Sequence, residues 1–357
     1  MNDVDRRTTY RRRWRRLVLR TQGRLDGENA DRALPWISAA LLFSILLALN
    51  AAAIRTLSGG SGLGPWIQAS WRRRNGGAGV PVGGVDPAHG TGSFISEPIL
   101  WFTRFVPAEA VFAIVQAGAI ALTVVPLWHL ARSEARLRVG AAMAVIVAFA
   151  LAPTLHRANL TAFHPELIAM PALVWAYERA CQRRWISYAV LVAVVLACRA
   201  DLGFTVLALG LLLVITGERR YGLWTMAVGF AWSMLGIWII DPATPDQALT
   251  PAGEFVARAT TPLAVLPNLM LHPITEAREL LAEPSVLFVV VVLSPLLFLP
   301  LMSPRKLLAA VPCLMLAMIA DRSVQRVAQV QVLDLAPAAA HIGPAVGFVF
   351  VALIFSL

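Results

Sequence analysis

Residues 34–54 read LPWISAALLFSILLALNAAAI, a run of 21 residues without a charged side chain. A helix rises 1.5 Å per residue, so this run would extend about 30 Å, the thickness of the hydrocarbon core of a bilayer. A long Arg-rich stretch precedes it and no small-residue cleavage site stands out, which favours a retained anchor over a secretory signal peptide. The sequence therefore predicts a membrane protein whose first span begins near residue 34.

The composition of the whole chain predicts further spans. Of the 357 residues, 58% are hydrophobic and 15% are charged, and the mean hydropathy is +0.67. Soluble domains carry about 25% charged residues, so a soluble enzyme is excluded. Other apolar runs lie at about 109–130, 139–155, 165–177, 186–198, 202–216, 222–240, 286–302, 307–320 and 343–357. We expect an all-α polytopic membrane protein of about ten transmembrane helices, with residues 34–357 as a single transmembrane domain.

The charge distribution predicts the orientation of the chain. Nine arginines fall within residues 6–24. Next to a span, such a segment is typical of a cytoplasmic tail attracted to anionic headgroups, so residues 1–33 are predicted to lie in the cytoplasm. The remaining chain has no basic cluster of that density, so membrane lipids are expected as partners and nucleic acid is not. We expect a multi-pass protein of the inner or plasma membrane.

Alternation from this tail places most other basic residues in short inner loops, as the positive-inside rule requires. The exception is Arg72-Arg73-Arg74, which falls in the first of three outer loops, at about 58–98, 241–284 and 321–342. Five of the six histidines fall on or near the outer face, namely His89, His156, His164, His272 and His341. His129, beside Trp128, falls at the inner interface and is interpreted as part of the aromatic belt.

Two polar motifs interrupt the apolar runs on the predicted outer side. Phe163-His164-Pro165-Glu166 stands between two short apolar segments, and Arg199-Ala200-Asp201 repeats the pattern further along. An ionisable group at membrane depth usually faces a protein-lined, watery cavity and marks a functional site. Two structural alternatives stay open: that Glu166 only complements the start of a helix, and that Arg199 and Asp201 form an interfacial ion pair.

The order of these motifs resembles the bacterial membrane family called domain of unknown function 2079, over about residue 63 to the end of the chain. The resemblance rests on LGPWIQASW at residues 63–71, Phe163-His164-Pro165-Glu166, RADLG at residues 199–203, LPLMSPR at residues 299–305 and the late His341. The family in turn resembles the GT-C membrane glycosyltransferases, which use polyprenyl-phosphate sugars. The resemblance implies a GT-C-like membrane core with long outer loops. It also implies sugar transfer from a lipid-linked donor on the outer face.

This activity would need a carboxylate to accept the acceptor's proton and donors to stabilise the departing phosphate. The resemblance implies Asp86 or Glu97 as the catalytic base. The implied substrate-binding residues are His89, His164, Glu166, Arg199, Asp201, His272 and His341. Within this set Arg199 would hold the phosphate, oriented by Asp201. His164 would donate to phosphate or sugar, with Glu166 as its orienting partner or as a sugar ligand.

The sequence departs from the family pattern in two of these motifs. Gly62 replaces an Asp before the Leu-Gly pair, and Arg199-Ala200 replaces Lys-Glu in the second motif. These departures leave two alternatives to the enzyme: a secondary transporter, whose broken helices also carry polar groups, and a non-catalytic, truncated or degenerate relative.

The cofactor is left open by the sequence, and so are the sugar, the acceptor and any protein partner. A divalent metal held by Asp86 and His89 is an alternative that their spacing does not single out. The three cysteines, Cys181, Cys198 and Cys313, follow no metal-binding or redox spacing, so no metal site is assigned.

Overall fold

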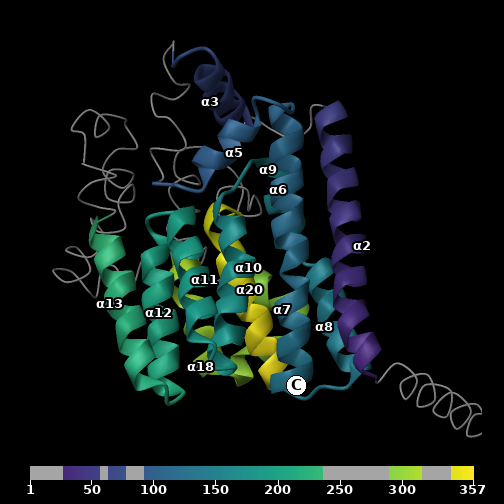
Figure 1. The fold of residues 1–357 in the computed structure, drawn as a ribbon. Helices are drawn as coiled ribbons and strands as arrows, with labels where there is room; N and C mark the ends of the chain where they lie inside the picture. The colour runs from purple at the N-terminus through teal and green to yellow at the C-terminus, as the bar shows by residue number, and fades with distance from the viewer. Residues whose placement is uncertain (1–26, 57–62, 78–91, 236–288, 316–338) are drawn as a thin grey trace, which may run out of the picture.

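The computed structural model describes residues 27–56, 63–77, 92–235, 289–315 and 339–357, and every regular element in them is helical (Figure 1). The expected all-α class is therefore confirmed. The apolar run that opens the chain lies in α2 (Glu28–Arg55), the longest described helix. Its Pro35 falls in the second turn, and Leu42 and Leu46 are buried against the bundle while Trp36 and Leu41 remain exposed.

Three described stretches are long and apolar enough to cross a membrane: Glu28–Arg55, Ala108–Glu134 and Val139–Thr161. The second comprises α6 (Ala108–Leu122), α7 (Val124–His129) and a π-helical turn, η2 (Leu130–Glu134). The third comprises α8 (Val139–Ala150) and α9 (Pro153–Thr161). Shorter apolar helices, α11 (Trp185–Cys198), α12 (Leu202–Ile215) and the residues Ile342–Ser356 of α20 (Ala339–Ser356), accompany them. The chain is thus a membrane protein with several apolar helices, and the figure of about ten spans stays a prediction.

Residues 289–307 differ from the continuous span expected at 286–302. Residues 289–293 are helical, and short pieces follow: η5 (Ser294–Leu296), η6 (Leu299–Met302) and α18 (Pro304–Leu307). Leu297 and Phe298, between the first two, adopt positive φ angles of 52° and 56°. Proline lacks an amide hydrogen and disrupts the preceding helical turn, and Pro295, Pro300 and Pro304 recur through this stretch. Hydropathy alone therefore overestimated its helical continuity.

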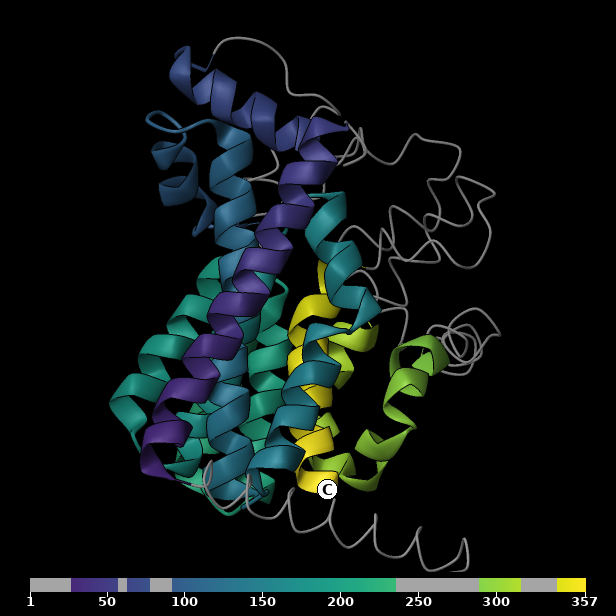
Figure 2. The same ribbon diagram turned by 90° about the vertical axis from the view of Figure 1, so that its right-hand side faces the viewer.

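Helix α10 (Glu166–Cys181) lies at the centre of the bundle in Figure 1 and contacts α6, α11 and α20, the last of which is the yellow helix in Figure 2. Small residues allow α20 to approach it closely. A Cβ atom placed on Gly343 would lie 2.5 Å from Leu167 Cδ2, and one on Gly347 would lie 3.0 Å from Val174 Cγ2. The start of α10 is therefore held in place by packing on several sides.

Helices α12 and α13 (Arg219–Leu235) form an antiparallel hairpin that lies beside α11 (Figure 1). Their contact is built on glycine. A Cβ atom on Gly222 would lie 2.7 Å from the carbonyl oxygen of Gly210, and one on Gly229 would lie 2.6 Å from that of Gly203. The two backbones therefore touch, as small residues permit in helix pairs within membranes. Gly217, with φ of +106°, makes the turn between them.

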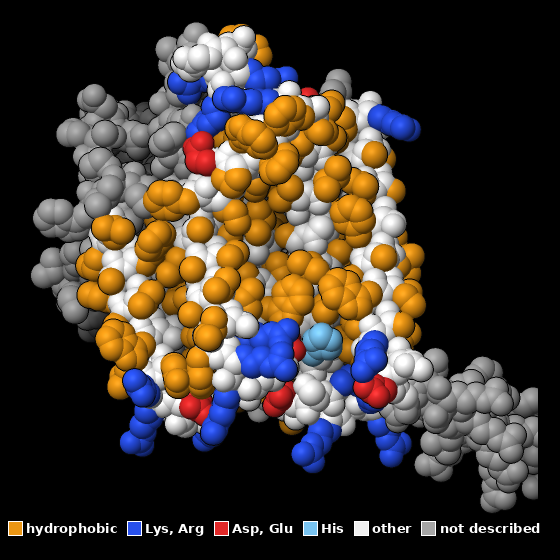
Figure 3. Space-filling view, in the orientation of Figure 1, with side chains coloured by type: hydrophobic (Ala, Val, Ile, Leu, Met, Phe, Trp, Pro, Cys, Tyr) orange, Lys and Arg blue, Asp and Glu red, His pale blue; other side chains and the backbone are white. Residues whose placement is uncertain are grey.

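The bundle has two polar ends. We call the end where α10 and α12 begin the site end, and the end where they finish the basic end. Figure 3 shows Lys and Arg side chains at both ends of one face, with a wide apolar band between them. The basic end includes Arg184, Arg219 and Arg220, which agrees with the basic loops expected together on one side. Which end faces the cytoplasm stays a prediction.

Candidate functional site

The two polar motifs form two neighbouring turns at the site end. After α9, Ala162 adopts an extended backbone (φ −162°), and α10 begins at Glu166 directly after Pro165. After α11, Arg199 is likewise extended (φ −167°), and Asp201 precedes the first residue of α12. Both apolar runs therefore break at their polar residues, as the sequence predicted.

These turns bring His164, Glu166, Arg199 and Asp201 together, and we call these four residues the ionisable cluster. Arg199 Nε lies 3.0 Å from Asp201 Oδ1, and Arg199 Nη1 lies 3.5 Å from Glu166 Oε1. On the other side of Glu166, its Oε1 lies 3.5 Å from His164 Nδ1. One guanidinium thus lies between two carboxylates, and an imidazole flanks one of them.

The ionisable cluster is largely withdrawn from solvent. Glu166 is 2% exposed, Asp201 8% and His164 9%, while the Arg199 side chain is 20% exposed. Removing one member of such a buried ion pair costs about 3–5 kcal/mol, because the remaining charge is left uncompensated. The Nε2 atom of His164 is buried and has no hydrogen-bond partner among the described residues. Buried imidazole nitrogens are normally satisfied, so this atom is an exception within the cluster.

Gln116 of α6 holds the turn that carries His164, and sequence analysis missed it. Its Nε2 atom donates to the carbonyl oxygens of Ala158, Asn159 and Ala162 at 3.0, 3.1 and 2.9 Å. Its Oε1 atom accepts a hydrogen bond from the backbone N–H of His164 at 2.8 Å. An amide side chain in an apolar span was the signal that could have identified it, since such groups are expensive in hydrocarbon without partners.

A pair of asparagine side chains anchors the end of α9 to α2. Asn50 Nδ2 donates to Asn159 Oδ1 at 3.0 Å, and Asn159 Nδ2 donates to the carbonyl oxygen of Leu46 at 3.3 Å. Both asparagines are buried. The loop in front of the ionisable cluster is therefore fixed from α2 and from α6.

The candidate base Glu97 lies in α5 (Ser96–Phe102), which begins beside the end of α11. The backbone N–H of Ile95 donates to the carbonyl oxygen of Ala197 at 3.0 Å. Glu97 lies two residues after Ile95, and Arg199 lies two residues after Ala197. The Glu97 carboxylate pairs with Arg73 of α3 (Gly64–Arg74), with Arg73 Nε 3.2 Å from Glu97 Oε2. Its side chain is 48% exposed. The structure thus brings the helix of Glu97 to the site end and ties its carboxylate to Arg73.

The other predicted site residues are placed less completely. Asp86, His89 and His272 lie outside the described residues. His341 lies in the first turn of α20, which packs beside the start of α10, and only its backbone is described. His156, on the predicted outer side, forms a hydrogen bond with the end of the preceding helix: its Nε2 lies 2.7 Å from the carbonyl oxygen of Ala150.

A buried carboxylate at the basic end also escaped sequence analysis. Glu178, 1% exposed, accepts a hydrogen bond from Gln182 Nε2 at 2.9 Å, and its Oε1 lies 3.2 Å from His129 Nδ1. His129, interpreted from the sequence as a belt residue, therefore takes part in a pair across two helices. Among the described residues no group of three or more His, Cys, Asp or Glu side chains is arranged to hold a metal ion.

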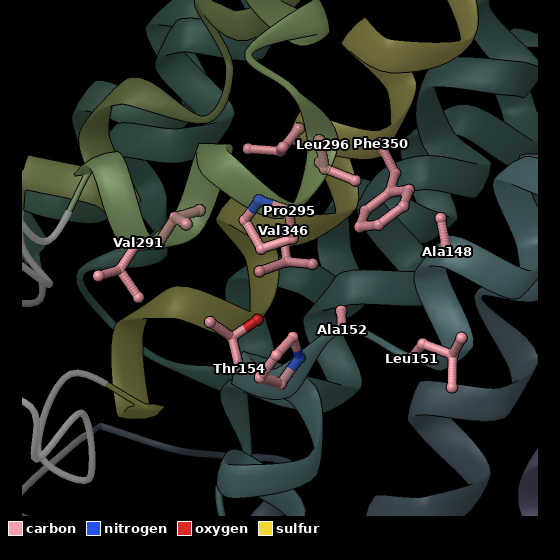
Figure 4. A pocket seen from close by; sticks show the side chains of 12 residues that line it. Ala148, Leu151, Ala152, Thr154, Val291, Pro295, Leu296, Val346 and Phe350 are labelled. Atoms are coloured by element: carbon pink, nitrogen blue, oxygen red, sulfur yellow. The ribbon is translucent and has the colours of Figure 1, made fainter.

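An apolar crevice of about 230 Å³ lies between α8, the start of α9, residues 291–296 and α20 (Figure 4). In Figure 4 the side chains of Thr154, Val346 and Phe350 surround the same space. Two elements link it to the ionisable cluster. Helix α9 leads from Pro153, at the crevice, to the turn of His164, and α20 packs on α10.

Residues 92–356 match the family described as predicted membrane protein (DUF2079). This match covers most of the chain, so the protein belongs to that family. The matched region contains both turns of the ionisable cluster and begins after residues 63–71, where the sequence resemblance started. The chain matches no curated protein and no solved structure.

Proposed function

We propose that this protein is a membrane glycosyltransferase that takes a sugar from a polyprenyl-phosphate donor on the outer face of the membrane. The ionisable cluster is the observation that carries the proposal. It gathers two carboxylates, a guanidinium and an imidazole at the end of an apolar bundle. Such a concentration of hydrogen-bonding groups suits a ligand that is polar at one end and anchored in lipid at the other.

The charges of the cluster suit a sugar next to a phosphate. Glu166 and Asp201 are acceptors for sugar hydroxyl groups, whereas Arg199 and the buried His164 Nε2 are donors for phosphate oxygens. Because two carboxylates already face the one guanidinium, a hydrogen bond from His164 would add to the stabilisation of the departing phosphate. In the proposed reaction the two acids therefore bind the sugar, and the two basic side chains bind the phosphate.

The proposed reaction needs one further carboxylate. The acceptor's hydroxyl oxygen attacks the anomeric carbon, its proton passes to the base, and polyprenyl phosphate departs with the electrons of the broken C–O bond. We assign the base to Asp86 or Glu97. The Ile95–Ala197 contact supports Glu97, because it brings the start of α5 next to the end of α11. Glu97 would have to turn from Arg73 towards the acceptor during the reaction.

The apolar crevice supports a lipid-linked donor. Its lining is almost entirely hydrocarbon, with Leu151, Leu296 and Phe350 among the larger side chains. Burial of an isoprenoid tail there would be favourable by about 25 cal/mol of free energy per Å² of apolar surface removed from water. Helix α20 would then contact the donor's tail through Val346, which lines the crevice. It would also support the helix that binds the donor's sugar, because Gly343 packs on α10.

The test is binding of a radiolabelled polyprenyl-phosphate sugar to the purified full chain in nanodiscs. The parent is expected to show saturable binding, and Glu166→Gln and Arg199→Gln are each expected to weaken it at least about tenfold, the value of one charge-assisted hydrogen bond. Glu178→Gln is the matched control, because it removes a buried carboxylate at the other end of the same helix. It should bind like the parent.

Thermal unfolding of each variant shows whether it is folded, and His164→Gln offers a milder change in the same cluster. The proposal fails if a folded parent does not bind the donor, in which case a transporter or a non-catalytic scaffold becomes the better account. It fails equally if folded variants of the ionisable cluster bind as tightly as the parent.

A further inference from the structure

The arginines that broke the expected charge pattern lie on a small unit at the site end, which we call the cap. It consists of α3, α5 and residues 103–107. Ser70 Oγ and Thr103 Oγ1 are 2.6 Å apart and join its two helices. Trp66 packs inward, with its ring 5.0 Å from that of Phe163, next to His164. The cap is thus attached to the bundle through the contact of Trp66 with Phe163.

The outer surface of the cap exposes large aromatic side chains. Trp71, Trp101, Phe102 and Phe105 are all at least half exposed, and Phe105 is 70% exposed. The ring of Trp101 lies 5.2 Å from that of Phe102 and 5.0 Å from that of Phe105, so three of them form one continuous patch. Contiguous exposed apolar surface of this kind marks an interaction site.

Arginines adjoin this aromatic patch. Arg74 follows Ser70 by one helical turn and Arg104 follows Thr103 directly, so both arginines are close in the chain to the Ser70–Thr103 contact that joins the cap. Both side chains belong to exposed residues. Arg73, which precedes Arg74, is already paired with the Glu97 carboxylate. Figure 3 shows Lys and Arg side chains next to apolar ones at the site end, above the apolar band.

We propose that the cap binds the headgroup of an anionic phospholipid in the leaflet at the site end. Arg74 and Arg104 hold the phosphate, and the patch of Trp101, Phe102 and Phe105 contacts the glycerol and upper acyl region. Aromatic rings concentrate at the membrane–water interface, and each arginine near an anionic surface adds about 1 kcal/mol of attraction. Charge complementarity favours an anionic lipid over a protein partner, and the proposal does not depend on the proposed enzyme activity.

The test is a quenching experiment on the full chain in nanodiscs. A bimane fluorophore is attached to Val106→Cys in a Cys181→Ser background, because Val106 is 42% exposed beside the patch and the other two cysteines are buried. Brominated phosphatidylglycerol or brominated phosphatidylcholine is then added as a minor lipid. We expect the anionic lipid to quench at least about threefold more strongly, a ratio that one arginine near the surface can supply.

The double variant Arg74→Gln/Arg104→Gln should bring this ratio to about one, and so should 1 M salt, which shortens the Debye length to about 3 Å. The matched control Arg219→Gln/Arg220→Gln removes two exposed arginines at the basic end and should leave the ratio unchanged. Equal quenching by both lipids in the parent would overturn the proposal, as would an unchanged ratio in the cap variant. Quenching by neither lipid would overturn it too, because the patch would then be covered by protein.

Discussion

Substitution of Gly222 by alanine tests the backbone contact between α12 and α13. A Cβ atom there would lie 2.7 Å from the Gly210 carbonyl oxygen and 2.8 Å from the Val214 backbone nitrogen. Ordinary contacts of a Cβ atom begin near 3.4 Å, so the two helices would have to separate by roughly 0.7 Å. Two of the three nearest atoms belong to backbone, which cannot rotate away as a side chain can.

The energetic effect has two opposing parts. Overpacking costs about 1–3 kcal/mol, and the backbone obstruction at Gly222 places this substitution at the upper end. Alanine gains about 1 kcal/mol over glycine in helix propensity. The expected net loss in the free energy of unfolding is therefore about 2 kcal/mol.

Reversible unfolding by SDS in mixed micelles, followed by circular dichroism, measures this loss. Gly118→Ala is the matched control, because its new Cβ atom would meet only Phe43 Cε2, at an ordinary 3.8 Å. It should be neutral or stabilising by up to about 1 kcal/mol. The double variant Gly210→Ala/Gly222→Ala should lose less than the sum of its parts, since both changes act on one gap. If Gly222→Ala is as stable as Gly118→Ala, the reasoning is refuted.

Two further predictions concern the turns of the ionisable cluster. Gln116→Leu removes the donor to three carbonyl oxygens and the acceptor for the His164 N–H, so it should destabilise the protein by about 3 kcal/mol in the same unfolding assay. A smaller loss of stability than that of Asn50→Leu would contradict this prediction. Asp201→Asn removes a buried charge opposite Arg199 and should cost about 3 kcal/mol. Arg199→Gln/Asp201→Asn should then be more stable than the sum of the single losses, and strict additivity would show that the pair is not coupled.

The fold class and the two polar turns could be predicted because hydropathy reports them directly. Charged residues that interrupt apolar runs can hardly remain inside hydrocarbon, so breaks near Glu166 and Arg199 were expected. Their position at the same end of the bundle followed from the alternation of spans. Their direct contact did not, because it depends on how α10 and α12 pack around α11.

The features that the sequence did not yield are those that depend on partners distant in the chain. Gln116 is one amide in an apolar helix, and nothing local shows that it serves a turn more than 40 residues later. Glu178 followed an apolar run and would ordinarily be assigned to a solvated helix end, but His129 and Gln182 enclose it. Residues 289–307 were misjudged for another reason: average hydropathy gives no weight to their prolines.

The packing of α20 on α10, the helix that carries Glu166, can be completed only late in synthesis. Neighbouring helices such as α12 and α13 can associate as soon as both have left the ribosome, whereas Gly343 meets Leu167 only after the intervening chain has been inserted. Until then α10, with Glu166 at its start, lacks one of its packing partners. Nascent chains arrested before α20 should therefore hold an unfinished site, open to chaperones and membrane proteases, while their α12–α13 hairpin is already formed.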